Sequence, residues 1–90
     1  MARRQPPVLH LYTRFGCGLC DRAARLVARE GRSAVTHTVD VDGDPELVRR
    51  YGVRVPVICV DGVEVAELEV APGQVRRALR AARRVRRSPG

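Results

Sequence analysis

The sequence predicts a single α/β domain, a four-stranded mixed sheet flanked by helices in the order β-α-β-α-β-β-α. Three observations support this fold class. Ninety residues suffice for one small domain with one core. Strand-like and helix-like segments alternate along the first half, which is typical of parallel strands joined by a helix. A two-residue turn signal then separates two further strand-like segments, which indicates an antiparallel hairpin.

The first half of the chain reads as strand, helix and strand. Residues 8–12 are mainly apolar and aromatic and predict a short strand. From Leu19 onward apolar residues recur at helical spacing, and Gly31 is a typical stop signal. Residues 35–41 alternate in polarity and predict a second strand, which a crossover through the helix makes parallel to the first.

Two further helices are expected in the second half. Residues 44–46 (Asp-Pro-Glu) form a strong helix start, with Asp as the N-cap and Pro at the first helical position. This short helix should end at Gly52. After Pro72-Gly73, an amphipathic helix is expected, whose apolar face carries Val75, Ala78, Leu79, Ala82 and Val85.

The hairpin is predicted from the dipeptide Asp61-Gly62, which favours a tight turn. Residues 57–60 and 63–65 flank it as strands. The apolar phase slips at Ala66, so we expect a β-bulge or an early strand end near this residue.

The charge is unevenly distributed along the chain. All 17 basic residues are arginine, against 10 acidic residues, for a formal net charge of +7. Seven of the arginines lie within residues 76–87, while the middle of the chain is slightly acidic. We expect a flexible leader at residues 1–7, a single domain at residues 8–87 that ends in a basic amphipathic helix, and a tail at residues 88–90.

The cysteine content is interpreted together with the expected location. No apolar segment follows the leader, and the longest strongly apolar run, residues 55–60, is far shorter than the roughly 20 residues of a membrane span. A cytosolic location is therefore expected. Three cysteines in the cytosol indicate catalysis, metal binding or burial rather than a disulfide framework.

Cys17 and Cys20 form a C-x-x-C pair between the first predicted strand and the first predicted helix. A helix N-terminus offers unpaired N–H groups and partial positive charge, both of which favour a thiolate. Cys17 lies on the turn and should be the more exposed thiol, with Cys20 within its reach one turn into the helix. This arrangement predicts attack on a disulfide by Cys17 and resolution by Cys20.

Other interpretations of these residues remain open. A zinc site needs four ligands, and the remaining candidates, Cys59, His10 and His37, each stand alone on a predicted strand, so no metal site is predicted. The C-x-x-C pair could also be inert. Cys59 is expected to be a small buried hydrophobic residue.

Three segments, in the same order, resemble a glutaredoxin-like protein of the thioredoxin superfamily. The resemblance runs from about Val8 to Leu79 and is greatest to a small glutaredoxin-like group with C-x-L-C sites. The matching segments are residues 12–20, which include Arg14 before the cysteines; residues 39–42 with 45–46 and 51–53; and residues 54–56 with 61–62.

The resemblance implies a role for each site residue. Cys17 would be the nucleophile and Cys20 the resolving thiol. Pro56 would follow a cis peptide bond facing the cysteines, and the backbone of Val55 would pair with an extended thiol substrate. Arg14 would favour the thiolate or hold a substrate carboxylate; the alternative is a solvated turn residue.

The sequence departs from the glutaredoxin pattern after the hairpin. Glutaredoxins usually carry a Gly-Gly pair and then an acid there, whereas residues 65–70 read Val-Ala-Glu-Leu-Glu-Val. Gly18 also replaces the Pro that is common after the first cysteine. These departures leave open whether glutathione, another small thiol or a flavoprotein reductase restores the dithiol.

The expected function is that of a monomeric thiol–disulfide oxidoreductase with no bound cofactor beyond its own thiols. Its partners would be a disulfide-containing protein or a small-thiol substrate, and a reductant, with no membrane partner. The alternative is a redox-switched binding module whose basic C-terminal helix contacts an acidic protein or nucleic acid. Nucleic acid is the less favoured partner, because no aromatic residues are interleaved with these arginines.

Overall fold

The computed structural model describes residues 5–87, which form the predicted series of strands and helices. None of the helices in this part of the chain is long and apolar enough to cross a membrane. The first four residues of the predicted leader and the predicted tail lie outside the described residues. The elements are β1 (Val8–Thr13), α1 (Gly18–Glu30), β2 (Val35–Asp40), a 3₁₀ turn η1 (Val41–Gly43), α2 (Pro45–Tyr51), β3 (Val57–Val60), β4 (Val63–Glu67) and α3 (Gln74–Arg87).

As predicted, the four strands form one mixed sheet, and the structure shows that their order is β2-β1-β3-β4. The central strand β1 pairs in parallel with β2, with Val8 opposite Val35, and antiparallel with β3, with Leu9 opposite Val60. The last part of the predicted leader also belongs to this layer, because Pro7 is buried and its carbonyl accepts a hydrogen bond from the Val35 N–H at 2.9 Å.

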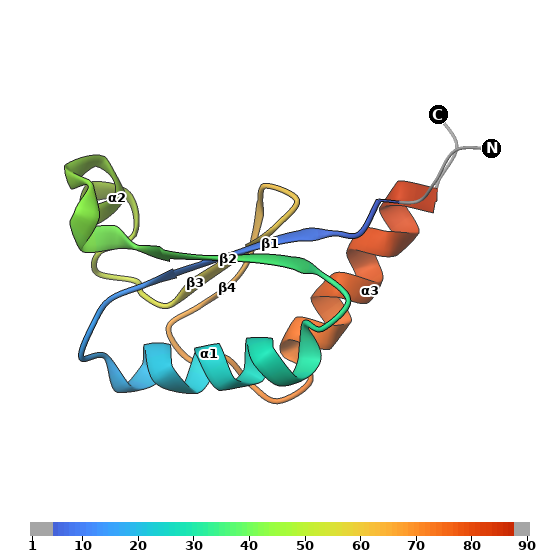
Figure 1. The fold of residues 1–90 in the computed structure, drawn as a ribbon, viewed down its shortest axis with the longest axis horizontal. Helices are drawn as coiled ribbons and strands as arrows, with labels where there is room; N and C mark the ends of the chain where they lie inside the picture. The colour runs from blue at the N-terminus through green and yellow to red at the C-terminus, as the bar shows by residue number, and fades with distance from the viewer. Residues whose placement is uncertain (1–4, 88–90) are drawn as a thin grey trace.

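The main core lies between the sheet and the helices α1 and α3, which cover the same face (Figure 1). Alternate side chains of β1 point into it, as the period of a strand requires. It is built from aliphatic residues, in agreement with the low aromatic content. Its buried members are Leu9, Leu11, Ala23, Leu26, Val27, Ile58, Val60, Val70, Val75 and Leu79.

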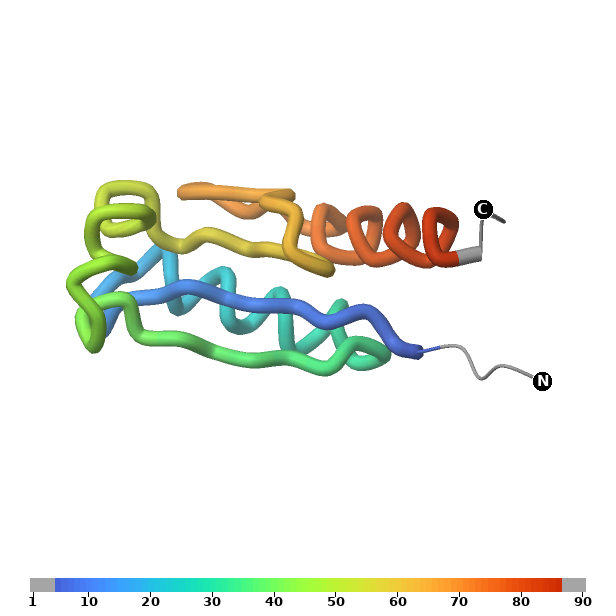
Figure 2. Tube along the Cα trace, turned by 90° about the horizontal axis from the view of Figure 1, so that it is seen from above, coloured from blue at the N-terminus to red at the C-terminus, as the bar shows by residue number. Residues whose placement is uncertain are grey.

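The opposite face of the sheet is covered only at one end, by the short helix α2 (Figures 1 and 2). A smaller core of Val41, Tyr51, Val55, Val57 and Cys59, joined by Cys20, lies at that end. The edge strand β2 is largely exposed over its length. Helices therefore cover both faces of the sheet at the end where β1 leads toward α1.

The hairpin between β3 and β4 has the predicted turn and a bulge. Asp61 and Gly62 have φ angles of 49° and 81°, so both central residues adopt the left-handed conformation of a type I′ turn. The register shifts between Ile58, opposite Ala66, and Cys59, opposite Glu64. The residue skipped between them produces the bulge predicted near Ala66.

Asp61 also links the hairpin by hydrogen bonds to the start of β1 and to the end of α3. Its Oδ1 accepts the Val8 N–H at 2.9 Å at the start of β1. The guanidinium of Arg86, near the end of α3, donates to both carboxylate oxygens at 2.6 and 2.7 Å. This hydrogen bonding holds the pKa of Asp61 below its usual value.

Helix α3 receives its N-terminal cap from another helix. The carboxylate of Glu30, at the end of α1, accepts the N–H groups of Gly73 at 2.7 Å and Arg76 at 3.0 Å. Burial alone would raise the pKa of Glu30, but these backbone hydrogen bonds outweigh burial and lower it. A negative charge at this position also complements the positive end of the helix dipole.

Asp61→Ala should lower the free energy of unfolding by about 1–3 kcal/mol, because it removes the carboxylate that accepts from Val8 and Arg86 and places Ala at a positive φ. Asp61→Asn is the matched control, since Asn tolerates a positive φ and keeps an acceptor for Val8. Asp61→Asn should lower the free energy of unfolding by less than Asp61→Ala does. Urea denaturation measures both values, and equal losses in the two variants would contradict the assignment.

Glu30→Gln should lower stability at neutral pH by about 1 kcal/mol, because the charged cap is lost. The folded-state pKa of Glu30 lies below its unfolded value, so its contribution is present above about pH 5 and disappears as the pH falls through the folded-state value. The difference between wild type and variant should therefore shrink below about pH 4. Denaturation curves across this range test it; a constant difference would exclude an ionised cap.

Candidate active site

Cys17 is the N-cap residue of α1. Its backbone is extended, and its Sγ accepts a hydrogen bond from the Cys20 N–H at 3.2 Å. The Cys17 carbonyl accepts the Asp21 N–H at 3.0 Å and so begins the helical ladder. Cys17 is half-buried, so it remains accessible to a reactant while its sulfur accepts this hydrogen bond.

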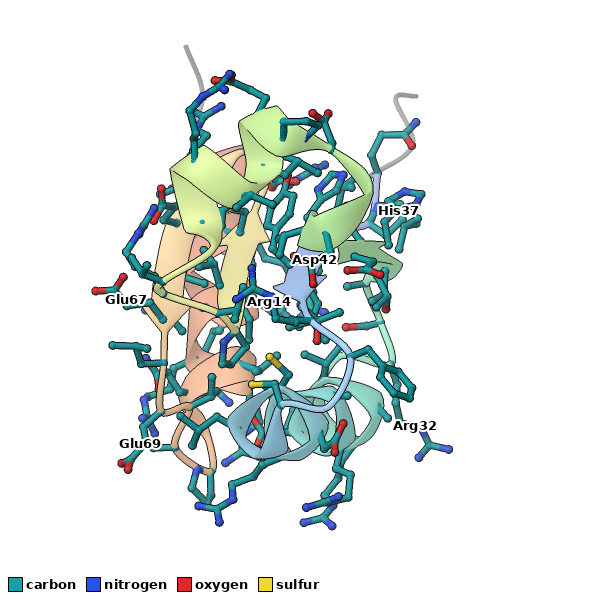
Figure 3. All side chains as sticks on the ribbon, turned by 90° about the vertical axis from the view of Figure 1, so that its left-hand side faces the viewer. Arg14, Arg32, His37, Asp42, Glu67 and Glu69 are labelled. Atoms are coloured by element: carbon teal, nitrogen blue, oxygen red, sulfur yellow. The ribbon has the colours of Figure 1, made fainter. Side chains whose placement is uncertain are left out.

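Cys20 lies one turn further along α1, on the face that meets the smaller core. Its side chain is only 1% exposed. Burial raises the pKa of the Cys20 thiol, and a hydrogen bond with Cys17 raises it further. The pair thus consists of an accessible sulfur that caps a helix and a protected thiol directly behind it, which Figure 3 shows as sulfur atoms at the start of α1.

The loop before β3 brings free backbone groups to the smaller core that also contains Cys20. Val55 and Pro56 are buried and are joined by a cis peptide bond, as the resemblance implies. Within residues 5–87, the N–H and C=O of Val55 have no hydrogen-bond partner. Its neighbours are paired, since the Leu68 N–H donates to the carbonyls of Arg54 at 3.2 Å and Pro56 at 2.8 Å.

Arg14 is engaged within the protein. Its guanidinium donates to both carboxylate oxygens of Asp42, with Nε to Oδ2 at 2.9 Å, and to the Gly52 carbonyl at 2.9 Å. Figure 3 shows the two side chains meeting beside the sulfur atoms. The pKa of Asp42 is lowered by this hydrogen bond. Arg14 therefore ties the loop before Cys17 to η1 and to the end of α2.

Arg54 makes a similar set of contacts in the loop that carries Val55. Its guanidinium contacts Glu64 at 2.7 Å and Glu67 at 3.0 Å, and it donates to the Arg50 carbonyl at 2.8 Å. Its hydrogen bonds to the two glutamates raise the pKa of Arg54, and they lower that of Glu64. The loop carrying Val55 is thereby fixed between α2 and β4.

The rim of the site is apolar where it is not ion-paired. Phe15, two residues before Cys17, is 96% exposed, and Val53, two residues before Val55, is 94% exposed. Leu68, after β4, is partly exposed and has a φ of 63°. Exposed apolar side chains therefore lie in the loops that lead to Cys17 and Val55 and in the segment that follows β4.

The remaining candidate ligands form no metal site with the cysteine pair in the described residues, although Cys59 belongs to the same small core as Cys20. Among residues 5–87, no three His, Cys, Asp or Glu side chains are arranged to hold a metal ion. His10 and His37 stack on each other across β1 and β2, with ring centroids 5.1 Å apart. Cys59 is buried on β3, and burial raises the pKa of its thiol.

The structure brings Cys17, Cys20, Val55 and Pro56 to one end of the sheet. Sequence reasoning missed the carboxylate partners of the two flanking arginines. A signal for one of them was present, because a parallel pairing of the first two strands puts Thr13 opposite Asp40 and so brings Arg14 close to the acids that follow β2. No comparable signal indicated that Arg54 would reach Glu64 and Glu67.

Comparison with known sequences agrees with the resemblance to glutaredoxin-like proteins. The family described as "Glutaredoxin-like domain (DUF836)" matches residues 8–80. An uncharacterized protein of Mycobacterium tuberculosis is 36% identical over 77 residues, and the match covers 78% of this chain and 79% of that protein.

Solved structures extend the similarity to the fold. The X-ray structure of a structural-genomics target protein from X. campestris has 35% identity and a TM-score of 0.71, covering 81% of this chain and 96% of that chain. A mutant thioredoxin from Halobacterium salinarum has 26% identity and a TM-score of 0.62, covering 84% of this chain and 74% of that chain.

The three cysteines should differ in reactivity toward iodoacetamide at neutral pH. Cys17 should be modified first, by a factor of about ten or more, because Cys20 and Cys59 are buried and their pKa values are raised. Peptide mapping by mass spectrometry gives the three rates, and urea-unfolded protein provides the control in which the rates converge. Faster modification of Cys20 or Cys59 would contradict the described geometry.

Proposed function

Because the chain belongs to the glutaredoxin-like domain family of the thioredoxin superfamily, we propose that it is a thiol–disulfide oxidoreductase that works through Cys17 and Cys20. Cys17 is the nucleophile and Cys20 the resolving thiol. Location in the cytosol, where thiols are kept reduced, is part of this proposal. The protein needs no bound cofactor for this reaction, since the two thiols supply both electrons.

The observation that carries the proposal is the position of the Cys17 sulfur at the N-cap of α1. A sulfur that accepts a helix N–H is in an environment that favours the anionic, nucleophilic form. The free N–H and C=O of Val55 add a place where an extended substrate can form main-chain hydrogen bonds. Together they support in-line presentation of a substrate disulfide to an accessible sulfur.

The proposed cycle transfers two electrons. The Cys17 thiolate attacks one substrate sulfur, the substrate S–S bond breaks, and the leaving thiolate takes up a proton. Cys20 then loses its proton and attacks the Sγ of Cys17, which releases the second substrate sulfur as a thiol. The protein is left with a Cys17–Cys20 disulfide, and an external thiol or a flavoprotein reductase returns the two electrons.

The surroundings of the dithiol bear on the choice of reductant. Arg14 and Arg54, the cations beside the pair, both have carboxylate partners, and Glu67 and Glu69 point outward on the neighbouring rim (Figure 3). Glutathione carries carboxylates at both ends and would find no unpaired guanidinium from these two residues. We therefore propose another thiol or a flavoprotein reductase as the physiological reductant.

Cys17→Ser should abolish reduction of 2-hydroxyethyl disulfide, because no nucleophile remains at the helix start. Cys20→Ser should form a mixed disulfide at Cys17 that accumulates, because the resolving thiol is absent. A coupled thiol assay measures the first effect, and intact mass spectrometry shows the second as an added 2-mercaptoethanol group.

Cys59→Ala is the matched control, since it removes the third thiol and keeps both cysteines of the pair. It should retain turnover. Turnover by Cys17→Ser, or failure of the wild-type protein to reduce this disulfide beyond its own thiols, would refute the proposed function.

A further inference from the structure

A basic groove runs along α1 below the dithiol. It has a volume of about 420 Å³ and lies between α1 and residues 69–72, the segment that leads from β4 toward α3. Arg22, Arg25 and Arg29 line its α1 side, and buried Leu26 and Val70 contribute to its apolar surface. We call this the α1 groove.

The three arginines of the α1 groove are charges without partners. Their spacing places them on one side of the helix. All three are exposed, and none forms an ion pair with another residue between 5 and 87. Arg14, Arg54 and Arg86, in contrast, are each held by carboxylates of the chain. Unlike those three, the groove arginines are available to a ligand.

Both walls of the groove begin at the proposed active site. On one side, Arg22 follows Cys17 by five residues, or roughly 7.5 Å of helix rise. On the other, residues 69–72 directly follow Leu68, which is hydrogen-bonded on both sides of Val55. A chain that pairs with Val55 and presents its sulfur to Cys17 can therefore continue into the groove.

We propose that the α1 groove binds an acidic stretch of a polypeptide whose disulfide is attacked by Cys17. This inference rests on the proposed function and adds its substrate class. Aspartate or glutamate side chains flanking the substrate cysteine would meet the arginines, while apolar side chains would contact Leu26 and Val70 and the exposed Phe15 and Val53 at the rim. Glu69 is the one acidic residue that lines the groove, and its side chain points away from the body of the protein (Figure 3).

The dimensions and chemistry of the groove favour a polypeptide over other anions. Its apolar surface gives no advantage to inorganic phosphate, and no aromatic side chain lines it for base stacking. The arginine-rich C-terminal half of α3 is less suited to the same substrate, because it lies at the opposite end of the molecule from the start of α1 (Figure 1). In addition, Arg83 and Arg86 are hydrogen-bonded within the chain.

The test uses symmetric disulfides of short synthetic peptides with one cysteine flanked on both sides by aspartate, by serine or by lysine. Pre-reduced full-length protein is mixed with each peptide, and the single-turnover rate is measured; one protein dithiol reduces one peptide disulfide to two peptide thiols. The aspartate peptide should react about tenfold faster than the serine peptide at low ionic strength, the scale of several exposed ion pairs acting together. The advantage should largely vanish at 1 M salt.

Two triple variants with equal net charge locate the effect. Arg22→Gln/Arg25→Gln/Arg29→Gln should lose most of the ratio between aspartate and serine peptides. Arg32→Gln/Arg80→Gln/Arg84→Gln, whose residues are exposed and do not line the groove, should keep it. In a second arm, binding of a fluorescent aspartate peptide to Cys17→Ser/Cys20→Ser protein is followed by anisotropy, which requires no redox chemistry.

The outcomes distinguish the proposed oxidoreductase function from the inference that the substrate is acidic. Reduction of 2-hydroxyethyl disulfide without any preference for the aspartate peptide would overturn the acidic-substrate inference and leave the proposed function intact. Peptide binding without any disulfide reduction would overturn the proposed function and, with it, the assignment of the bound peptide as a disulfide substrate, and would leave only a groove that binds acidic peptides. Equal losses in both triple variants would assign the effect to net charge, and tighter groove-dependent binding of an oligothymidylate would assign the groove to nucleic acid; either result overturns the inference.

Discussion

Strand β1 is the constraint on which the other elements depend. It pairs with β2 on one side and β3 on the other, and its buried Leu9 and Leu11 hold α1 and α3 against the sheet. Because the strand ends directly before the loop to α1, the pairing that fixes β1 also fixes where Cys17 begins the helix. The dithiol is therefore placed at the end of a central strand of the sheet, and the opposite end of the same strand is held by Asp61.

Arginine side chains fix the loops that the hydrogen bonds of the sheet do not hold in place. Arg14 joins the active-site loop to η1 and α2, Arg54 joins the Val55 loop to β4, and Arg86 joins α3 to the hairpin. Each uses several donors of one planar guanidinium, which a lysine could not do in the same geometry. In this chain without lysine, some of the arginines thus form ion pairs that join one element to another. Among the described residues, the arginines that form no such pair are the ones available to a partner.

Most of the fold follows from local sequence patterns, whereas the electrostatics of the site do not. The Asp44 cap, the Asp61-Gly62 turn and the bulge near Ala66 were all predictable, because each depends on residues close together in the chain. The pairing of Arg14 with Asp42 joins residues 28 positions apart, and that of Arg54 with Glu64 depends on the exact register across the bulge. The sequence therefore indicated a dithiol with a nearby cation but not that the cation was already neutralised.

The sulfur of Cys17 is both the helix cap and, in the proposed cycle, the reacting atom. An N-cap contributes about 1 kcal/mol to its helix. A sulfur bonded to a second sulfur is a poorer acceptor than a thiolate, so oxidation should weaken the hydrogen bond that caps the first turn of α1. Oxidation state and local helix stability are consequently linked quantities. A substitution that stabilises the reduced start of α1 should therefore also change how readily the dithiol gives up its electrons.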